Sequence, residues 1–334
     1  MFLTLLIIYL SIHITLSSSK FEPKIPKEYE IAPWYGFKPS VITYSFDDGT
    51  FNHLLKAVPL LDKYKFKGSF NLITKRNNDW DGYKKAAENG HEISSHTITH
   101  PHLKEMDKET QTQELKESKK LIEKMVGQEC VTIVYPYCEA GDYEIMEKYY
   151  ISGRSCSRKY ISNNPDDMFD LSSFGIGNES NYKTAEDLNN LVDKAYEQKK
   201  WIIFLIHGID NDGGYSHFDS FELENHFQYV TKNEKKFWVA TFRDASKYIL
   251  EANSLIISEN KDDEDNIIIE VSTEYKTDIT KLDFPVTVSR LLDEKWKEVT
   301  ILKEDDLSEI ESEIKEDKII FDVVPGEKYI LKYK

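Results

Sequence analysis

The chain has 334 residues, a formal net charge of −16 at pH 7 and 40% hydrophobic residues. This length allows one large α/β domain and a smaller second domain, and the apolar content supports packed cores, which excludes a disordered chain. The negative charge balance leaves no basic stripe that could neutralise phosphates, so we expect no nucleic-acid partner.

Residues 1–19 predict a secretory signal peptide that is removed from the mature protein. An apolar run from Phe2 to Leu10 leads into three serines, and no charged residue precedes Lys20. An uncleaved membrane anchor is the alternative, but this stretch is short for the ~20 apolar residues that span a bilayer. We therefore expect a secreted protein with no membrane span in its mature form.

An N-terminal arm is expected over residues 20–38, followed by a domain over 39–252 in which strands and helices alternate. The predicted strands cover 41–49, 68–72, 91–95, 130–135, 152–156, 201–206 and 237–241, and the predicted helices cover 52–64, 81–89, 108–126, 143–150, 184–199, 218–232 and 244–252. Such alternation indicates parallel strands with crossover helices. No glycine-rich phosphate loop follows any strand, which favours a barrel over a nucleotide-binding sheet.

The pattern changes after residue 252. A linker is predicted over 253–265, and short alternating strands over 266–334 predict a small all-β, sandwich-like domain. We interpret this domain as structural support, with a glycan- or partner-binding module as the alternative.

Two adjacent carboxylates, Asp47 and Asp48, end the first predicted strand and precede Gly49. Like charges side by side repel each other, so the pair calls for a metal ion or an arginine nearby. A helix N-cap is the alternative interpretation, because Asp before a helical run caps free amides.

Three histidines provide further candidate site residues. His96 and His100 are four residues apart, so one helical turn would bring both imidazoles to the same side, where Asp48 could complete a three-ligand metal site. His207 follows the apolar strand 201–206 and is a candidate proton donor to a leaving group. The spacing His-Glu-x-x-His is absent, which argues against a zinc peptidase.

Four motifs in order resemble those of the polysaccharide deacetylases, carbohydrate esterase family 4. They are Ser-Phe-Asp-Asp-Gly at 45–49, His-Thr-Ile-Thr-His-Pro at 96–101, Tyr-Pro-Tyr at 135–137 and Leu-Ile-His at 205–207. The resemblance covers about 39–252 and implies a distorted (β/α) barrel. The segment 284–299 resembles the small β domain that follows this barrel in some bacterial-type relatives.

The resemblance also implies roles for individual residues. Asp48, His96 and His100 are expected to bind a divalent ion, most fittingly Zn2+. Asp47 is expected to act as the general base that activates water, and His207 as the general acid. A backbone amide near Tyr137, beside Pro136, is expected to contact the oxyanion.

Three positions depart from the family pattern. Val134 stands where an arginine often holds the base, and we expect Arg154 or Arg158 to replace it. Cys138 stands where glycine is usual. The fourth motif has no clear match, so the candidates to orient His207 are Asp170, ranked first, and the nearby Asp166 and Asp167.

These residues predict an exported, metal-dependent hydrolase that removes N-acetyl groups from an N-acetylglucosamine-containing polysaccharide, chitin or a similar glycan. The alternatives are O-deacetylation of a polysaccharide such as xylan, and a non-catalytic carbohydrate-binding protein on the same fold. The presence of both a base and an acid favours an enzyme. The aromatic residues Tyr137, Trp80 and Tyr215 are candidates for stacking on sugar rings. Three cysteines, at positions 130, 138 and 156, allow at most one internal disulfide, whose pairing stays open.

Overall fold

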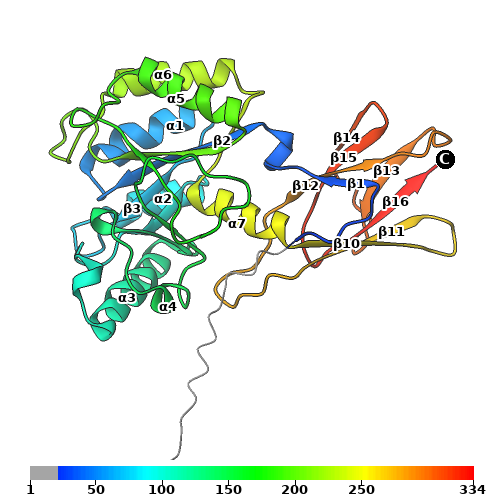
Figure 1. Ribbon diagram of the computed structural model, residues 1–334, viewed down its shortest axis with the longest axis horizontal. Helices are drawn as coiled ribbons and strands as arrows, with labels where there is room; N and C mark the ends of the chain where they lie inside the picture. Colours follow the sequence, from blue (N-terminus) through cyan, green and yellow to red (C-terminus); the bar gives the residue numbers. More distant parts are fainter. Residues whose placement is uncertain (1–21) are drawn as a thin grey trace, which may run out of the picture.

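A computed structural model describes residues 22–334, so the predicted signal peptide lies outside the described residues. Two units lie side by side (Figure 1): an α/β unit, and a unit made only of β-strands, with helix α7 (Phe242–Asn253) at their boundary. The expected combination of a barrel and a small all-β domain is therefore confirmed.

The α/β unit is built on an eight-stranded sheet in which the paired strands are parallel. Its order is β6-β5-β4-β3-β2-β8-β7, and β9 also pairs with β2. The strands are β2 (Ser40–Asp47), β3 (Ser69–Leu72), β4 (Glu92–Ser95), β5 (Thr132–Val134), β6 (Ser152–Arg154), β7 (Phe174–Gly175), β8 (Trp201–Ile206) and β9 (Phe237–Val239). Parallel pairing brings the carboxyl ends of β2, β4 and β8 to one rim of the sheet.

An irregular segment closes the curled sheet into a distorted barrel. The amide of Gly153 in β6 donates to the carbonyl of Met168 at 2.8 Å, and the amide of Leu171 donates back to Gly153 at 3.1 Å. The same segment continues into β7, which pairs with β8. The two edges of the sheet thus meet through a loop rather than through a regular strand pair.

Helices cover the barrel, and local sequence signals fix several of their ends. Helix α3 begins after Asp107, whose side chain accepts the amide of Thr110, and ends at Gly127, whose φ of 78° suits glycine. Helix α5 begins with a capping box between Thr184 and Asp187. The remaining helices besides α7 are a π-helical turn η2 (His53–Ala57) that leads into α1 (Val58–Lys63), then α2 (Trp80–Glu88), α3 (Lys108–Val126), α4 (Tyr143–Met146), α5 (Ala185–Gln198) and α6 (Ser220–Lys232), with 3-10 turns η1 (Tyr35–Phe37), η3 (Leu103–Glu105) and η4 (Pro136–Cys138).

The β unit is a sandwich of two antiparallel four-stranded sheets, in the orders β1-β12-β15-β14 and β10-β11-β16-β13. Alternate residues of both sheets, such as Ile269 and Val288, are fully buried between them. The strands are β1 (Tyr29–Ile31), β10 (Leu255–Lys261), β11 (Ile267–Thr273), β12 (Val286–Leu291), β13 (Val299–Lys303), β14 (Ser312–Lys315), β15 (Lys318–Val323) and β16 (Lys328–Tyr333).

Two strands of the sandwich lie where the sequence predicts none. Strand β10 occupies most of the predicted linker 253–265, since Leu255 and Ile257 are buried and the strand pairs along its length with β11. Strand β1 lies in the predicted arm 20–38 and pairs with β12. A three-residue strand whose partner is about 260 residues away leaves no local signal.

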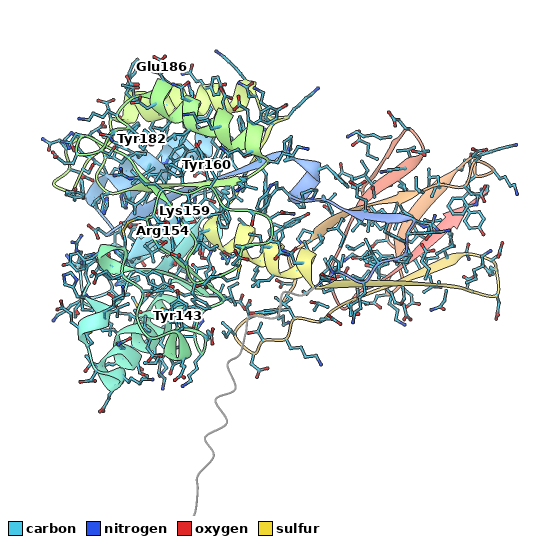
Figure 2. The ribbon with its side chains drawn as sticks, in the orientation of Figure 1. Tyr143, Arg154, Lys159, Tyr160, Tyr182 and Glu186 are labelled. Carbon is cyan, nitrogen blue, oxygen red and sulfur yellow. A yellow bond between two sulfur atoms is a disulfide. The ribbon has the colours of Figure 1, made fainter. Side chains whose placement is uncertain are left out.

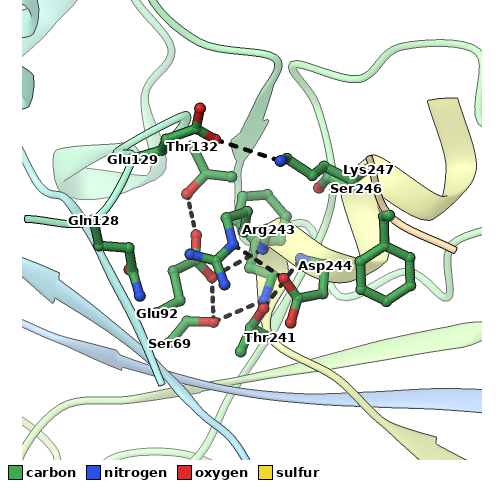
Figure 3. Close-up of polar contacts among 12 residues, drawn as sticks. Ser69, Glu92, Gln128, Glu129, Thr132, Thr241, Arg243, Asp244, Ser246 and Lys247 are labelled. Carbon is green, nitrogen blue, oxygen red and sulfur yellow. Dashed lines mark hydrogen bonds and ion pairs between the residues drawn. The ribbon is translucent and has the colours of Figure 1, made fainter. Parts of the chain in front are cut away.

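A buried polar network fixes α7 to the rim at the amino ends of the strands (Figure 3). Glu92, fully buried at the start of β4, accepts hydrogen bonds from Ser69, Thr132 and the amide of Arg243. The amide of Phe242 donates to Ser69 at 2.8 Å. Glu92 and Ser69 thus satisfy two of the free amides that any helix has at its first turn.

A second buried carboxylate lies on the other end of α7, where the helix meets the sandwich. Glu251 is fully buried and accepts the amide of Phe284 at 3.1 Å. Burial, with a smaller contribution from Asp283, raises its pKa to about 8, although the Phe284 amide and Lys247 oppose the shift. Glu251 is therefore uncharged in the folded protein at neutral pH.

We expect Glu251 to make the folded state less stable as the pH rises. The pKa of Glu251 is about 8 in the folded protein and has its ordinary value of 4.5 in the unfolded chain. Between pH 4.5 and pH 8, therefore, only the unfolded chain loses this proton. The free energy of unfolding then falls through this window, by up to about 1.4 kcal/mol per pH unit. Glu251→Gln, which cannot ionise, should lack this fall in urea unfolding measured from pH 5 to 9.

The exposed Glu88 on α2 provides the matched control. Glu88→Gln should keep the wild-type pH dependence. Stability curves for Glu251→Gln that run parallel to wild type would contradict the assignment of a raised pKa to Glu251.

Candidate active site

The carboxyl ends of the barrel strands surround a cleft of about 550 Å³. Its lining includes five of the residues predicted from the sequence, which come from the ends of three strands and the loops that follow them: Asp47, Asp48, His96, His100 and His207. The cleft thus brings the predicted base, acid and metal ligands into one space.

Asp47 is the last residue of β2 and is held by two side chains. Its Oδ1 accepts from Asn71 Nδ2 at 2.7 Å, and its Oδ2 forms a buried ion pair with Arg154. Arg154 ends β6, lies within the body of the barrel (Figure 2) and also donates to Ser173 at 2.8 Å. Arg158, the other arginine considered from the sequence, lines the cleft at a different position.

The environment of Asp47 keeps its carboxylate charged. Burial on its own would raise the pKa, but Arg154, followed by His96, His207 and Asn71, outweighs burial and leaves the pKa below its ordinary value. A buried, charged carboxylate with its two oxygens fixed in position can accept a proton from a water molecule in the cleft.

Asp48 follows in a tight turn, with φ of 78° at Asp48 and 68° at Gly49. Its Oδ1 lies 3.6 Å from His96 Nε2 and 3.9 Å from His100 Nε2, too far for hydrogen bonds. This buried oxygen has no hydrogen-bond partner in the described part of the chain.

The donor atoms of these three residues lie within 4.8 Å of one another. Two imidazoles and one carboxylate are ligands that divalent metals such as Zn2+ accept, with bonds of about 2.0–2.2 Å to each donor. An unpartnered carboxylate oxygen facing two imidazole nitrogens at such spacing fits a shared metal ion. Asp48, His96 and His100 are therefore a candidate metal site.

The protonation of His96 also suits a metal ligand. Its Nδ1 lies 2.8 Å from the carbonyl of Val134, which can only accept, so Nδ1 carries the proton and Nε2 keeps its lone pair. Burial lowers the pKa of His96 to about 4 against the opposite effect of Asp47 and Asp48. His96 is neutral at pH 7 and able to coordinate.

The expected helical turn between the two histidines is wrong. The backbone bends instead, with φ of 66° at Thr97 and 60° at His100. The buried carboxylate of Glu114, on α3, accepts the amides of Ile98 and Thr99 and so replaces the hydrogen bonds that a helix would make. The two imidazoles lie together as the four-residue spacing predicts, but by a different backbone path.

His207 lies just beyond the end of β8, and its surroundings differ from expectation. The fully buried His53 donates from Nε2 to the carbonyl of His207 at 2.6 Å, and Tyr215 contacts its ring at 5.2 Å between centroids. Asp170 instead accepts from Ser155 at 2.6 Å, so the expected contact between Asp170 and His207 is wrong. The reason is that Asp170 belongs to the irregular segment that pairs with β6.

Within the described part of the chain, the imidazole of His207 consequently has no carboxylate partner. Its Nδ1 is buried and has no hydrogen-bond partner among residues 22–334. Of the other candidates, Asp167 accepts from Tyr143 at 3.0 Å.

The Tyr-Pro-Tyr turn after β5 forms one wall of the cleft. Tyr137, with φ of 55°, is 54% exposed, and its ring lies 4.6 Å from that of His100. A disulfide joins Cys138 to Cys156 after β6, which settles the pairing that the sequence left open, and Cys130 is free and buried. This bridge ties the wall to the strand that carries Arg154.

The turn can offer an amide to the cleft. The amides of Cys138 and Glu139 donate within the turn, to Tyr135 and Pro136, whereas the Tyr137 amide has no internal acceptor in the described part of the chain. Pro136 has no amide to donate. Of the three aromatic residues expected to stack on sugars, Tyr137 and Tyr215 line the cleft, but Trp80 packs against the core instead.

Sequence reasoning missed three supporting residues: Asn71, His53 and Glu114. Asn71 stands opposite Asp47 in the register of β2 and β3, so its place near the end of the second predicted strand was a usable signal. His53 and Glu114 act through contacts between distant segments and carry no such signal.

Comparison with known proteins agrees with this geometry. Residues 35–148 match the family model described as polysaccharide deacetylase. This chain therefore contains a segment, residues 35–148, that is similar to the polysaccharide deacetylases. The matched region contains Asp47, Asp48, His96, His100 and Tyr137, whereas the positions of Arg154 and His207 rest on the structure alone.

Two relatives place the family match in context. A gellan lyase from Bacillus sp is 25% identical over 308 residues, covering 86% of this chain and 12% of the lyase. YxkH of Bacillus subtilis, assigned by its name to the polysaccharide deacetylases, is 31% identical over 128 residues, covering 36% of this chain and 46% of YxkH. The chain therefore spans less than half the length of either relative.

A crystal structure from Mycobacterium smegmatis, assigned to the polysaccharide deacetylases, has the same fold. It superposes with a TM-score of 0.51 at 13% identity and covers 66% of this chain and 95% of that chain. As for membrane insertion, residues 22–334 contain no helix that is both long and apolar enough to span a bilayer.

We expect His96→Ala to lower the affinity for Zn2+ by more than about 100-fold, because loss of a direct ligand should exceed the roughly 10- to 100-fold loss from changes around a metal site. Isothermal titration of the metal-free protein with Zn2+ measures this. His102→Ala is the matched control, since His102 stacks on Tyr137 at 3.8 Å but lies outside the cluster. Equal affinities of His96→Ala and wild type would rule out this site.

We expect Arg154→Ala to lower the free energy of unfolding by about 3–5 kcal/mol, because it leaves the buried carboxylate of Asp47 without a partner. The double variant Asp47→Asn with Arg154→Met removes both charges and should be more stable than Arg154→Ala. Urea unfolding of the three proteins tests this, and a loss below 1 kcal/mol for Arg154→Ala would contradict it.

Proposed function

We propose that this protein is a secreted, metal-dependent polysaccharide deacetylase that hydrolyses N-acetyl groups on an N-acetylglucosamine-containing glycan, chitin or a similar polymer. One observation carries the proposal: Asp47, held as a carboxylate by Arg154 and Asn71, lies beside the Asp48, His96 and His100 cluster in one cleft.

Asp48, His96 and His100 would hold the metal, and Zn2+ suits this ligand set best. When bound, such an ion polarises the acetyl carbonyl and lowers the pKa of a coordinated water. Asp47 takes the proton from the attacking water, and its fixed orientation removes the entropic cost of aligning a base during the reaction.

Tyr137 and His207, which also line the cleft, serve the attack on the carbonyl and the departure of the amine. The Tyr137 amide donates to the oxygen that becomes negative as the carbonyl is attacked. His207 gives a proton to the leaving nitrogen. The His53 contact fixes the backbone of His207 but leaves its ring without a carboxylate partner.

That missing partner favours a second candidate, O-deacetylation of a polysaccharide such as xylan. An alcohol leaves more readily than an amine, so an ester substrate depends less on an acid whose imidazolium is stabilised by a carboxylate. The same base, amide and metal ligands serve both reactions.

Secretion is supported by two independent features. The first is the predicted signal peptide in residues 1–19. The second is the Cys138–Cys156 disulfide, because disulfides persist mainly in oxidising compartments outside the cytosol.

Acetate release tests the proposal, with N-acetylglucosamine oligomers and acetylated xylan as substrates for the Zn2+-reconstituted protein. We expect release from the amino-sugar oligomers, its loss after chelation, and a fall of at least about 100-fold in kcat for Asp47→Asn. Asp81→Asn, an exposed carboxylate on α2, is the matched control and should keep full activity.

Release from xylan alone would favour the ester candidate. An Asp47→Asn variant with wild-type activity would remove Asp47 as the base. No release from either substrate by protein with stoichiometric Zn2+ would reject both activities.

A further inference from the structure

A second pocket, of about 350 Å³, opens beside the catalytic cleft. It shares His100 and Tyr137 with the cleft, so a ligand in one space is adjacent to a ligand in the other. The remaining lining residues are Ile73, Lys75, Arg76 and Thr99. None of the residues in this lining is acidic, in a chain whose net charge is −16.

Two adjacent cationic side chains, Lys75 and Arg76, give this pocket a positive charge. Arg76 donates from Nη1 to the carbonyl of Asp48 at 3.0 Å, its Nη2 lies 3.9 Å from the Asp48 carboxylate, and its side chain is 50% exposed. The Lys75 ammonium has no ion pair with any residue in 22–334. Balancing the charge of Asp48 would explain why Arg76 is present. It would not explain the second positive charge, on Lys75.

The loop that carries both cations is held in place. The amide of Lys75 donates to the carbonyl of Ile98 at 3.0 Å, and the amide of Arg76 donates to Ile73 at 3.1 Å. Asn78 Nδ2 donates to the carbonyl of Ile73 at 3.1 Å and closes the loop. The backbone that carries both cations is therefore held in place before any ligand arrives, which lowers the cost of binding.

We propose that this pocket is a subsite for the carboxylate of a uronic acid residue next to the acetylated sugar, so that the preferred substrate is an acidic polysaccharide. This inference rests on the proposed deacetylase function. A planar carboxylate suits the guanidinium of Arg76, whose side chain is half exposed, and Lys75 adds a point charge. Tyr137 lines both spaces and is 54% exposed, so its ring can contact the sugar that links them, while His102 stacks on one of its faces.

The test compares three substrates that differ only in charge near the acetyl group. The first is an oligosaccharide in which N-acetylglucosamine alternates with glucuronate, the second is its methyl ester, and the third is a neutral N-acetylglucosamine oligomer. We expect kcat/KM for the charged oligosaccharide to exceed that for its methyl ester about tenfold at low salt, and the preference to shrink in 0.5 M NaCl.

Lys75→Gln should reduce this ratio of charged to esterified substrate about threefold, and Lys75→Glu should abolish it. Lys84→Gln is the matched control, because Lys84 is an exposed lysine on α2 that lines neither pocket. It should leave the ratio unchanged. A ratio of one in wild type, or an equal effect of Lys75→Gln and Lys84→Gln, would overturn the subsite.

The anion itself is checked with a sulfated N-acetylglucosamine oligomer. We expect the carboxylated substrate to be preferred, and a stronger preference for the sulfated one would overturn the assignment to a carboxylate.

Binding measured without turnover separates this inference from the proposed function. Titration of the wild-type protein and Lys75→Gln with the charged oligosaccharide and its methyl ester gives dissociation constants whether or not acetate is released. Acetate release without any charge preference rejects the subsite alone. Charge-dependent binding that weakens in Lys75→Gln, without acetate release from any substrate, supports the subsite and rejects the deacetylase function.

Discussion

The buried ion pair between Asp47 and Arg154 is the constraint on which the rest of the cleft depends. Two charges can remain out of water only when each has the other at close range and further hydrogen bonds satisfy their remaining atoms. Asn71 and Ser173 each provide one such bond, whereas the buried Nε of Arg154 has no hydrogen-bond partner within residues 22–334. The pair spans the barrel from the end of β2 to the end of β6, so the Asp47 carboxylate is oriented only when these distant strands are both in place.

The two adjacent aspartates illustrate how one turn separates two chemical roles. The left-handed backbone at Asp48 and Gly49 sends neighbouring carboxylates into different environments. Asp47 receives an arginine and an amide, whereas Asp48 keeps an unpartnered oxygen facing two imidazoles. Identical side chains thus become an oriented carboxylate and a candidate metal ligand because of their neighbours rather than their own chemistry.

Regular elements with strong patterns could be predicted from the sequence. Helix α3 and strand β8 lie at their predicted bounds, because helical periodicity and a continuous apolar run are local signals. The grouping of Asp48, His96 and His100 could also be predicted, since parallel strands deliver their carboxyl ends to one rim. The features that failed depend on contacts between distant segments: Glu114 supporting the bend at His96, the closing segment that takes Asp170 away from His207, and the choice between Arg154 and Arg158.

The pairing of β1 with β12 has a consequence for how the chain is organised. The first described strand precedes the barrel, yet its hydrogen-bonding partner belongs to the last part of the chain. In the order of the chain, the barrel is therefore inserted between β1 and the remaining strands of the sandwich, so the two units are not simply consecutive. During synthesis the residues of the barrel are complete before those of the sandwich. Strand β1 cannot pair until β12 has been synthesised. If evolution exchanged only the segment after the barrel, β1 would lose β12, its pairing partner. The two units are therefore expected to be inherited together.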